Sequence, residues 1–178
     1  SRLRASNTSS AQNFPLFTSS GNTVLSNEQL LTLLDTAQSR SLTQNRSNID
    51  LREILQTLIS QAQEGEESVA VEKVDEDIIN LVAMFFDFVL DDHSIPDNVK
   101  ALIGRLQMPA LKIALKDKNF FTDNDHAVRR FINEIARISV GVNDDDKAAK
   151  SLYQKLEQWV HDIQSTTGSA VDAFASSL

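Results

Sequence analysis

The histidines are the first residues to examine for chemistry, because imidazole serves as a general base, a proton carrier and a metal ligand. His93 follows Asp91 and Asp92, and such a carboxylate–imidazole pair could act as a general base. A charged, solvated turn fits these residues better. His126 stands at an expected helix start, where capping or packing is the more common role. None of the histidines, His161 included, has H-E-x-x-H or another two-ligand helical spacing, so a zinc site has no support.

Two acidic clusters resemble calcium loops at first sight. Asp123, Asn124 and Asp125 supply side-chain oxygens, and Glu134 stands at the twelfth loop position, but Val128 stands at the sixth, where a calcium loop needs Gly. Counted from its first residue, the run at 143–146 has neither the Gly at the sixth position nor the Glu at the twelfth. Asp and Asn favour helix caps and turns, so we interpret both clusters as helix-boundary residues and assign no metal ligand.

Glycine and cysteine usage argues against enzyme chemistry. The five glycines form no phosphate-binding loop, dinucleotide fingerprint or G-x-S-x-G turn. Gly104 stands alone inside an expected helix, where it costs about 1 kcal/mol relative to Ala, and we interpret it as a close helix crossing. The absence of cysteine excludes disulfides, thiolate metal sites and Cys nucleophiles. We therefore assign no catalytic or cofactor-binding residue and expect no enzyme.

Overall charge and hydropathy restrict the class of partner. The chain has 178 residues, enough for one domain, with 17 Lys+Arg against 25 Asp+Glu and a net charge of −8. An acidic protein is a poor nucleic-acid binder, because that affinity comes from neutralising phosphates. No apolar run approaches the ~20 residues of a membrane-spanning helix, and the first residues lack a signal-peptide core. We expect a cytoplasmic protein without membrane insertion.

Charge is unevenly distributed along the chain. Between residues 96 and 137 the net charge is +3, which leaves −11 for the remainder. Eight basic residues lie there: Lys100, Arg105, Lys112, Lys116, Lys118, Arg129, Arg130 and Arg137. This island could bind an acidic partner, a nucleotide or an anionic surface. It could equally pair with the protein's own acidic helix ends, such as Asp91 and Asp92, and this second interpretation is the more common situation.

Phe120 and Phe121 lie within the basic island, in an expected loop. Buried anchors are one interpretation, and an exposed aromatic pair beside cations, typical of an interface hot spot, is the other. For the second interpretation we define the basic surface as the candidate partner-binding site. Its residues are Lys112, Lys116, Lys118, Phe120, Phe121, Arg129 and Arg130.

Helical periodicity governs the chain from Ser26 onward. Ser26 and Gln29 have capping-box spacing. Helices are expected over about 26–38, 48–63, 74–90, 94–106, 109–117, 126–140 and 147–164, with polar segments at 39–48 and 64–73. No segment has the period-two alternation of a strand, and 69–74 is the nearest approach. The predicted fold is all-α, with about 6–8 helices paired antiparallel in a bundle or short HEAT-like array.

One segment is more apolar than the rest. Residues 78–90 carry apolar side chains on nearly every face, which predicts a buried central helix. By contrast, 1–25 is rich in Ser, Thr and Asn and predicts a flexible lead-in before a single helical domain over 26–178. Phe14, Leu16 and Phe17 could instead pin this lead-in onto the domain.

Residues 74–141 resemble a known family. The pieces LVAMFFDFVLDD, IPDNVKALIGRLQMPALKIALKDKNFF and HAVRRFINEIA look like the core of a proteobacterial domain-of-unknown-function family. Its members are long cytoplasmic proteins, often mislabelled thymidine phosphorylase. The resemblance implies a helical segment of a larger bacterial protein and carries over no catalytic residue. Some members are associated with a PilZ-type cyclic-di-GMP domain, but the Arg-x-x-x-Arg signature is missing here, so such recognition would lie elsewhere in the parent protein.

Two functions follow as expectations. The first is a non-enzymatic helical scaffold or protein-interaction module of a larger regulatory protein, with an acidic partner on the basic surface. The alternative is a nucleotide or cyclic-dinucleotide sensing module whose arginines hold phosphate oxygens. A carboxylate–histidine enzyme would require Asp92 and His93 to face a pocket. The sequence leaves the oligomeric state open.

Overall fold

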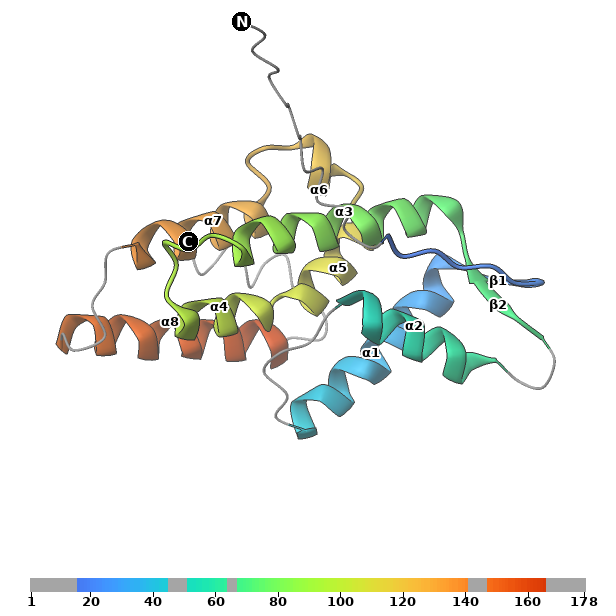
Figure 1. The fold of residues 1–178 in the computed structure, drawn as a ribbon, viewed down its shortest axis with the longest axis horizontal. Helices are drawn as coiled ribbons and strands as arrows, with labels where there is room; N and C mark the ends of the chain where they lie inside the picture. Colours follow the sequence, from blue (N-terminus) through green and yellow to red (C-terminus); the bar gives the residue numbers. More distant parts are fainter. Residues whose placement is uncertain (1–15, 45–50, 64–66, 141–146, 166–178) are drawn as a thin grey trace, which may run out of the picture.

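The computed structural model describes residues 16–44, 51–63, 67–140 and 147–165, and these residues are mostly helical (Figure 1). The all-α class predicted from the sequence is confirmed. In chain order the elements are β1 (Thr23–Leu25), α1 (Asn27–Gln44), α2 (Leu51–Ala62), β2 (Val69–Val71), α3 (Lys73–Leu90), α4 (Asp97–Gly104), α5 (Gln107–Lys116), α6 (Asn119–Thr122), α7 (Ala127–Ser139) and α8 (Lys147–Ser165).

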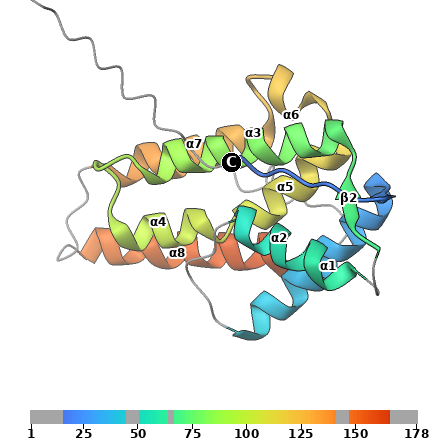
Figure 2. The same ribbon diagram turned by 45° about the vertical axis from the view of Figure 1, so that its right-hand side comes forward.

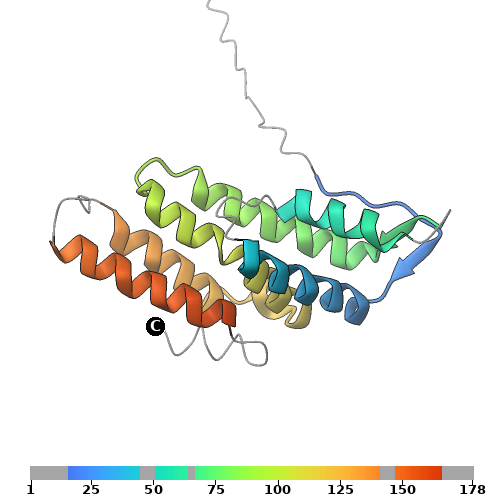
Figure 3. The same ribbon diagram turned by 90° about the horizontal axis from the view of Figure 1, so that it is seen from below.

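The helices form antiparallel pairs in an elongated array. α3 and α4 run in opposite directions, as do α7 and α8 (Figures 1 and 3). α4 packs against both α7 and α8, which joins the two pairs. α5 packs against α3 and α1, and α2 packs against α3 and β2. The strand pair, α1 and α2 therefore form one end of the array (Figure 2).

The start of α1 follows the predicted capping box. The backbone N–H of Ser26 donates to Gln29 Oε1 at 2.9 Å, and the backbone N–H of Gln29 donates to Ser26 Oγ at 3.3 Å. Two orphan donors of the helix N-terminus are thereby satisfied. Farther along α1, helix continues to Gln44, into the segment predicted as a polar linker.

β1 and β2 were not predicted. They pair in parallel over three residues each, in the register Thr23 with Val69 to Leu25 with Val71. Every β2 residue is buried, so β2 has no alternating pattern to detect. Gly21 permits the close approach of the two segments, because a Cβ there would lie 2.4 Å from the carbonyl oxygen of Ser68.

Residues 16–25 are packed onto the domain, so the prediction of a flexible lead-in is wrong for this part. Phe17 is fully buried, and its backbone N–H and carbonyl bond the Asn80 side chain of α3 at 2.8 and 2.9 Å. Ser19 donates to Glu76 Oε2 from its backbone and its hydroxyl. The pinning interpretation is confirmed for Phe17, Leu16 is 61% exposed, and Phe14 lies outside the described residues.

One apolar core connects all the major elements. Its largest fully buried side chains are Phe17, Phe86, Phe120 and Phe131, which come from the N-terminal segment, α3, α6 and α7. Gly104 does not mark a close helix crossing, contrary to our interpretation. A Cβ there would meet Gln107 Nε2 at 3.8 Å, an ordinary contact, and Gly104 is simply the last residue of α4.

Candidate interaction surface

Two of the seven residues predicted for the basic surface are buried, so for Lys112 and Phe120 the prediction is wrong. Lys112 is 8% exposed, and its ammonium forms an ion pair with Asp35 of α1 and donates to Gln38 Oε1 at 2.7 Å. Its apolar stem lies in the core between α5 and α1. Lys112 therefore holds two helices together and is not available to a partner.

Phe120 is fully buried, and Phe121 is half-buried. Their rings meet edge to face, with centroids 4.8 Å apart, and the ring of Phe120 also packs against His126 at 5.1 Å. α6 is the helical turn that carries this pair, inside the segment predicted as a loop. The buried-anchor interpretation is thus confirmed for Phe120.

The other residues of the basic surface surround the turns between α5 and α7. Lys116, Lys118 and Arg130 are exposed. Arg129 is half-buried and donates from Nη1 to Asp123 O and Asn124 Oδ1, both at 3.4 Å. Three aspartates at 117, 123 and 125 stand among these four cations, so the segment from 116 to 130 has a net charge of +1. The cations in this segment are therefore nearly balanced by aspartates close to them in the sequence.

The predicted pairing of the basic island with the protein's own carboxylates is confirmed for two residues. Lys112 pairs with Asp35, and Arg137 makes a bidentate contact with Glu134. Arg137 Nε donates to Glu134 Oε2 at 2.9 Å, and Arg137 Nη2 donates to Glu134 Oε1 at 2.5 Å. This contact raises the pKa of Arg137 and lowers that of Glu134 through their hydrogen bonds. The carboxylate partners differ from the predicted Asp91 and Asp92. Lys100 does act on Asp92, as a minor electrostatic cause of its lowered pKa.

Neither His93 nor His126 lines the cavity between α4, α7 and α8. His126 is buried and caps α7, since the backbone N–H of Val128 donates to its Nδ1 at 3.3 Å, and its Nε2 lies 3.5 Å from Asp117 Oδ2. His93 is exposed in the turn after α3. The neighbouring Asp92 accepts from the hydroxyl and backbone N–H of Ser94 at 2.6 and 2.8 Å, and these hydrogen bonds lower its pKa. Both histidines have the structural roles favoured by the sequence.

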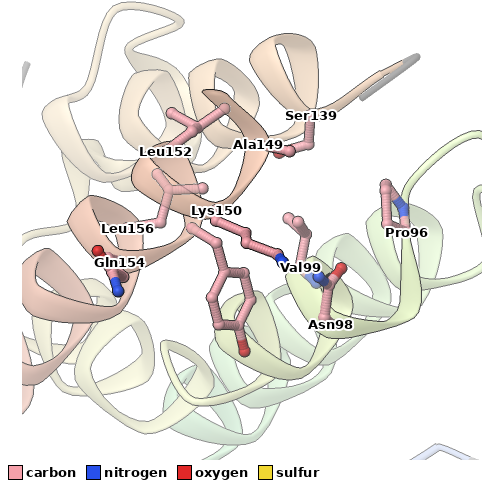
Figure 4. A pocket seen from close by; sticks show the side chains of 10 residues that line it. Pro96, Asn98, Val99, Ser139, Ala149, Lys150, Leu152, Gln154 and Leu156 are labelled. Carbon is pink, nitrogen blue, oxygen red and sulfur yellow. Dashed lines mark hydrogen bonds between the residues drawn. The ribbon is translucent and has the colours of Figure 1, made fainter. Parts of the chain in front are cut away.

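A cavity of about 230 Å³ lies between α4, the end of α7 and α8 (Figure 4). Its wall is largely aliphatic and includes Val99, Leu152 and Leu156, while the Lys150 side chain extends toward Asn98 at the mouth. Within the described residues, no group of three or more His, Asp or Glu side chains could hold a metal ion. The residues that line the cavity include no His, Asp or Glu.

The surface that sequence reasoning missed lies on α3. This helix was predicted to be buried on nearly all sides, and that prediction is wrong. Four of its apolar side chains are substantially exposed, namely Val74 at 55%, Leu81 at 46%, Met84 at 47% and Phe88 at 81%. The opposite side of α3, with Ile79, Val82, Ala83 and Phe86, is in the core.

The exposed side of α3 has a seven-residue repeat. Val74, Leu81 and Phe88 are seven residues apart, as are Asp77, Met84 and Asp91, and all six are exposed. We call these six residues the α3 seam. Alternate spacings of three and four put them on one face of the helix, the pattern by which helices pack lengthwise. The sequence contains this seven-residue repeat, but apolar residues on the other faces of α3 made it hard to recognise.

The helices among the described residues include none with both the length and the apolar character needed to cross a bilayer. Comparison with curated proteins and with solved structures gives no match. Comparison with family descriptions gives a match over residues 24–169, to the second domain of the DUF1631 proteins of unknown function. The match begins within β1 and includes β2 and helices α1 to α8, and thus the whole α3 seam. The chain therefore belongs to the DUF1631 family and corresponds to its second domain.

Proposed function

We propose that this domain is a non-enzymatic helical protein-interaction module of a larger bacterial regulatory protein, with the α3 seam as its contact surface. The observation that carries the proposal is the exposure of Leu81, Met84 and Phe88 in a row along one helix. Large exposed apolar side chains are common singly, but a contiguous row marks an interaction site. Phe88 in particular exposes 81% of its surface.

A carboxylate–histidine site at Asp92 and His93 gains no support from the structure. Both residues lie in an exposed turn, and neither lines the cavity between α4, α7 and α8. The bacterial and cytoplasmic setting comes from the resemblance of residues 74–141 to long proteobacterial proteins often mislabelled thymidine phosphorylase.

Site-specific photo-crosslinking in cells of the source organism tests the proposal. A benzoylphenylalanine at Met84 samples the α3 seam, and the same residue at Gln56, which is exposed on α2, serves as the control. The expected result is a small set of crosslinked proteins specific to position 84, lost when Phe88→Asp is added. Equal products from both positions, or none from position 84, would overturn the assignment of the seam.

The exposed part of the basic surface provides a second test position. Lys118 samples the neighbourhood of Lys116 and Arg130. Crosslinks from position 118 that disappear on charge reversal of Arg129 and Arg130 would support an acidic partner on this surface instead. A thermal-shift series with cyclic dinucleotides addresses the sensing alternative, since a ligand that binds the native state raises its melting temperature.

A further inference from the structure

We infer that the partner of the α3 seam is a helix with an apolar stripe flanked by cationic side chains. This inference rests on the proposed function and specifies the class of partner. It depends on the order of residues along the seam. Leu81, Met84 and Phe88 follow one another along the seam, with Asp77 before them and Asp91 after them, and Val74 lies one turn beyond Asp77.

The geometry selects a helical partner. α3 lies along one long edge of the array (Figures 1 and 3). From Asp77 to Asp91 the seam advances 14 residues, or about 21 Å along the helix axis. A straight row of this length, repeating every seven residues, fits the side of one other helix, whose apolar residues would enter the spaces around Leu81, Met84 and Phe88.

The charges select a cationic partner. Around the apolar centre, the exposed charged residues at the two ends of α3 are Glu72, Lys73, Asp77, Asp91 and Asp92, with a net charge of −3. Lys73 bonds Glu76 at 3.2 Å and Asp77 at 3.0 Å, which raises its pKa, but its side chain is 76% exposed. Such a surface ion pair is weak, so an incoming cation can compete for Asp77.

The C-terminal end of the seam is more strongly acidic. Asp91 takes part in no ion pair within the described part of the chain, and Asp92 is exposed beside it. Both lie at the end of α3 where the helix dipole is negative, so a cation there is favoured by the carboxylates and by the dipole. The net charge of −8 on the whole chain also favours approach of a basic partner.

A second copy of the chain does not satisfy these charges. In an antiparallel pair of seams, Asp77 would face the second copy's Asp91. In a parallel pair, each aspartate would face its own equivalent. Both arrangements put like charges against each other at both ends, which disfavours self-association. The seam therefore calls for a different chain that carries Lys or Arg where α3 carries Asp.

Two synthetic helices of about three heptads test this inference against the full 178-residue chain. The basic peptide has leucines in the middle of its seam and lysines 14 residues apart at the ends. The acidic peptide is identical except for glutamates at those two positions. Fluorescence anisotropy should show at least about tenfold tighter binding of the basic peptide, with affinity falling as salt is added.

A charge-swapped chain provides the decisive comparison. Asp77→Lys with Asp91→Lys should invert the preference, so that the acidic peptide binds tighter. The matched control is Glu28→Lys with Glu53→Lys, two exposed glutamates on α1 and α2, which changes the net charge equally and should leave the preference unchanged. Circular dichroism checks that each variant keeps its helical content.

Each other outcome overturns the inference in a distinguishable way. Equal binding of both peptides, abolished by Phe88→Asp, would refute the cationic partner while leaving the α3 seam as the contact surface. Binding of neither peptide would refute this class of partner, and the crosslinks from Met84 would then decide separately whether the seam is a surface for proteins at all. A dimer in sedimentation analysis that Phe88→Asp dissociates would assign the seam to a second copy.

Discussion

The ion pair between the buried Lys112 and the half-exposed Asp35 makes the strongest prediction about stability. The two partners differ in exposure, since the Lys112 side chain is 11% exposed and the Asp35 side chain 53%. In Asp35→Asn the ammonium stays buried without its counter-ion. Breaking a fully buried pair from one side costs about 3–5 kcal/mol, and an exposed pair contributes about 0–1 kcal/mol. Because the Asp35 carboxylate is half in water, we expect Asp35→Asn to lower the free energy of unfolding by about 1–2 kcal/mol.

A double-mutant cycle separates this pair from other effects of the substitutions. Lys112→Met keeps most of the apolar stem and removes the ammonium. In the Lys112→Met background Asp35 has no buried cation to neutralise, so Asp35→Asn should then change the free energy of unfolding by less than about 0.5 kcal/mol. The coupling energy between the two positions is therefore expected to be about 1–2 kcal/mol.

The assay is urea unfolding followed by far-ultraviolet circular dichroism near neutral pH. Glu28→Gln is the control, because Glu28 is an exposed carboxylate on the same helix. This substitution should change the free energy of unfolding by no more than about 0.5 kcal/mol. If Asp35→Asn were neutral in both backgrounds, the Lys112 ammonium would have to be in solvent. Lys112 would then return to the exposed basic surface, and the reasoning from burial would be refuted.

Three further predictions concern α3, the turn after it and the strand pair. Phe86→Ala should lower the free energy of unfolding by about 3–5 kcal/mol because Phe86 is 1% exposed. Phe88→Asp should change the free energy of unfolding by no more than about 0.5 kcal/mol, because Phe88 is 81% exposed. The folded-state pKa of Asp92 should lie below the ordinary aspartate value of about 3.9, so its stabilising contribution is present above that pH and is lost as pH falls through the lowered value. Carboxyl NMR titration should find this pKa partly restored in Ser94→Ala, which keeps the backbone donor; an unchanged value would exclude the hydroxyl as its main cause. Gly21→Ala should accelerate amide exchange in β1 and β2, because its Cβ meets backbone 2.4 Å away, and unchanged exchange would contradict the close approach.

Local features of the fold were predictable from the sequence. The capping box of Ser26 and Gln29 and the cap at His126 involve residues two or three positions apart, so their spacing alone identifies them. The long helices follow from the 3.6-residue period in the same way. β1 and β2 were not predicted, because each is three residues long and its partner lies 46 positions away in the sequence. No local sequence pattern covers that distance.

The candidate site was less predictable, because exposure depends on distant contacts. Nothing near Lys112 in the sequence indicates a carboxylate at position 35, so its charge looked available to a partner. Periodicity places Phe86 and Phe88 on different faces of α3 but does not say which face a neighbouring helix covers. α5, α4 and α2 cover the face of Phe86, and they leave Phe88 outside.

The placement of charge explains why function is better inferred from α3 than from the basic island. Several cations are taken up inside the domain: Lys112 ties α5 to Asp35 of α1, and Arg52 ties α2 to Asp87 of α3. A cation used in this way adds to the positive charge of its segment in the sequence but is already paired within the domain. On α3 the carboxylates of Asp77 and Asp91 are exposed on either side of the row formed by Leu81, Met84 and Phe88. The helical partner that we infer for this row would supply the positive charge that the row lacks.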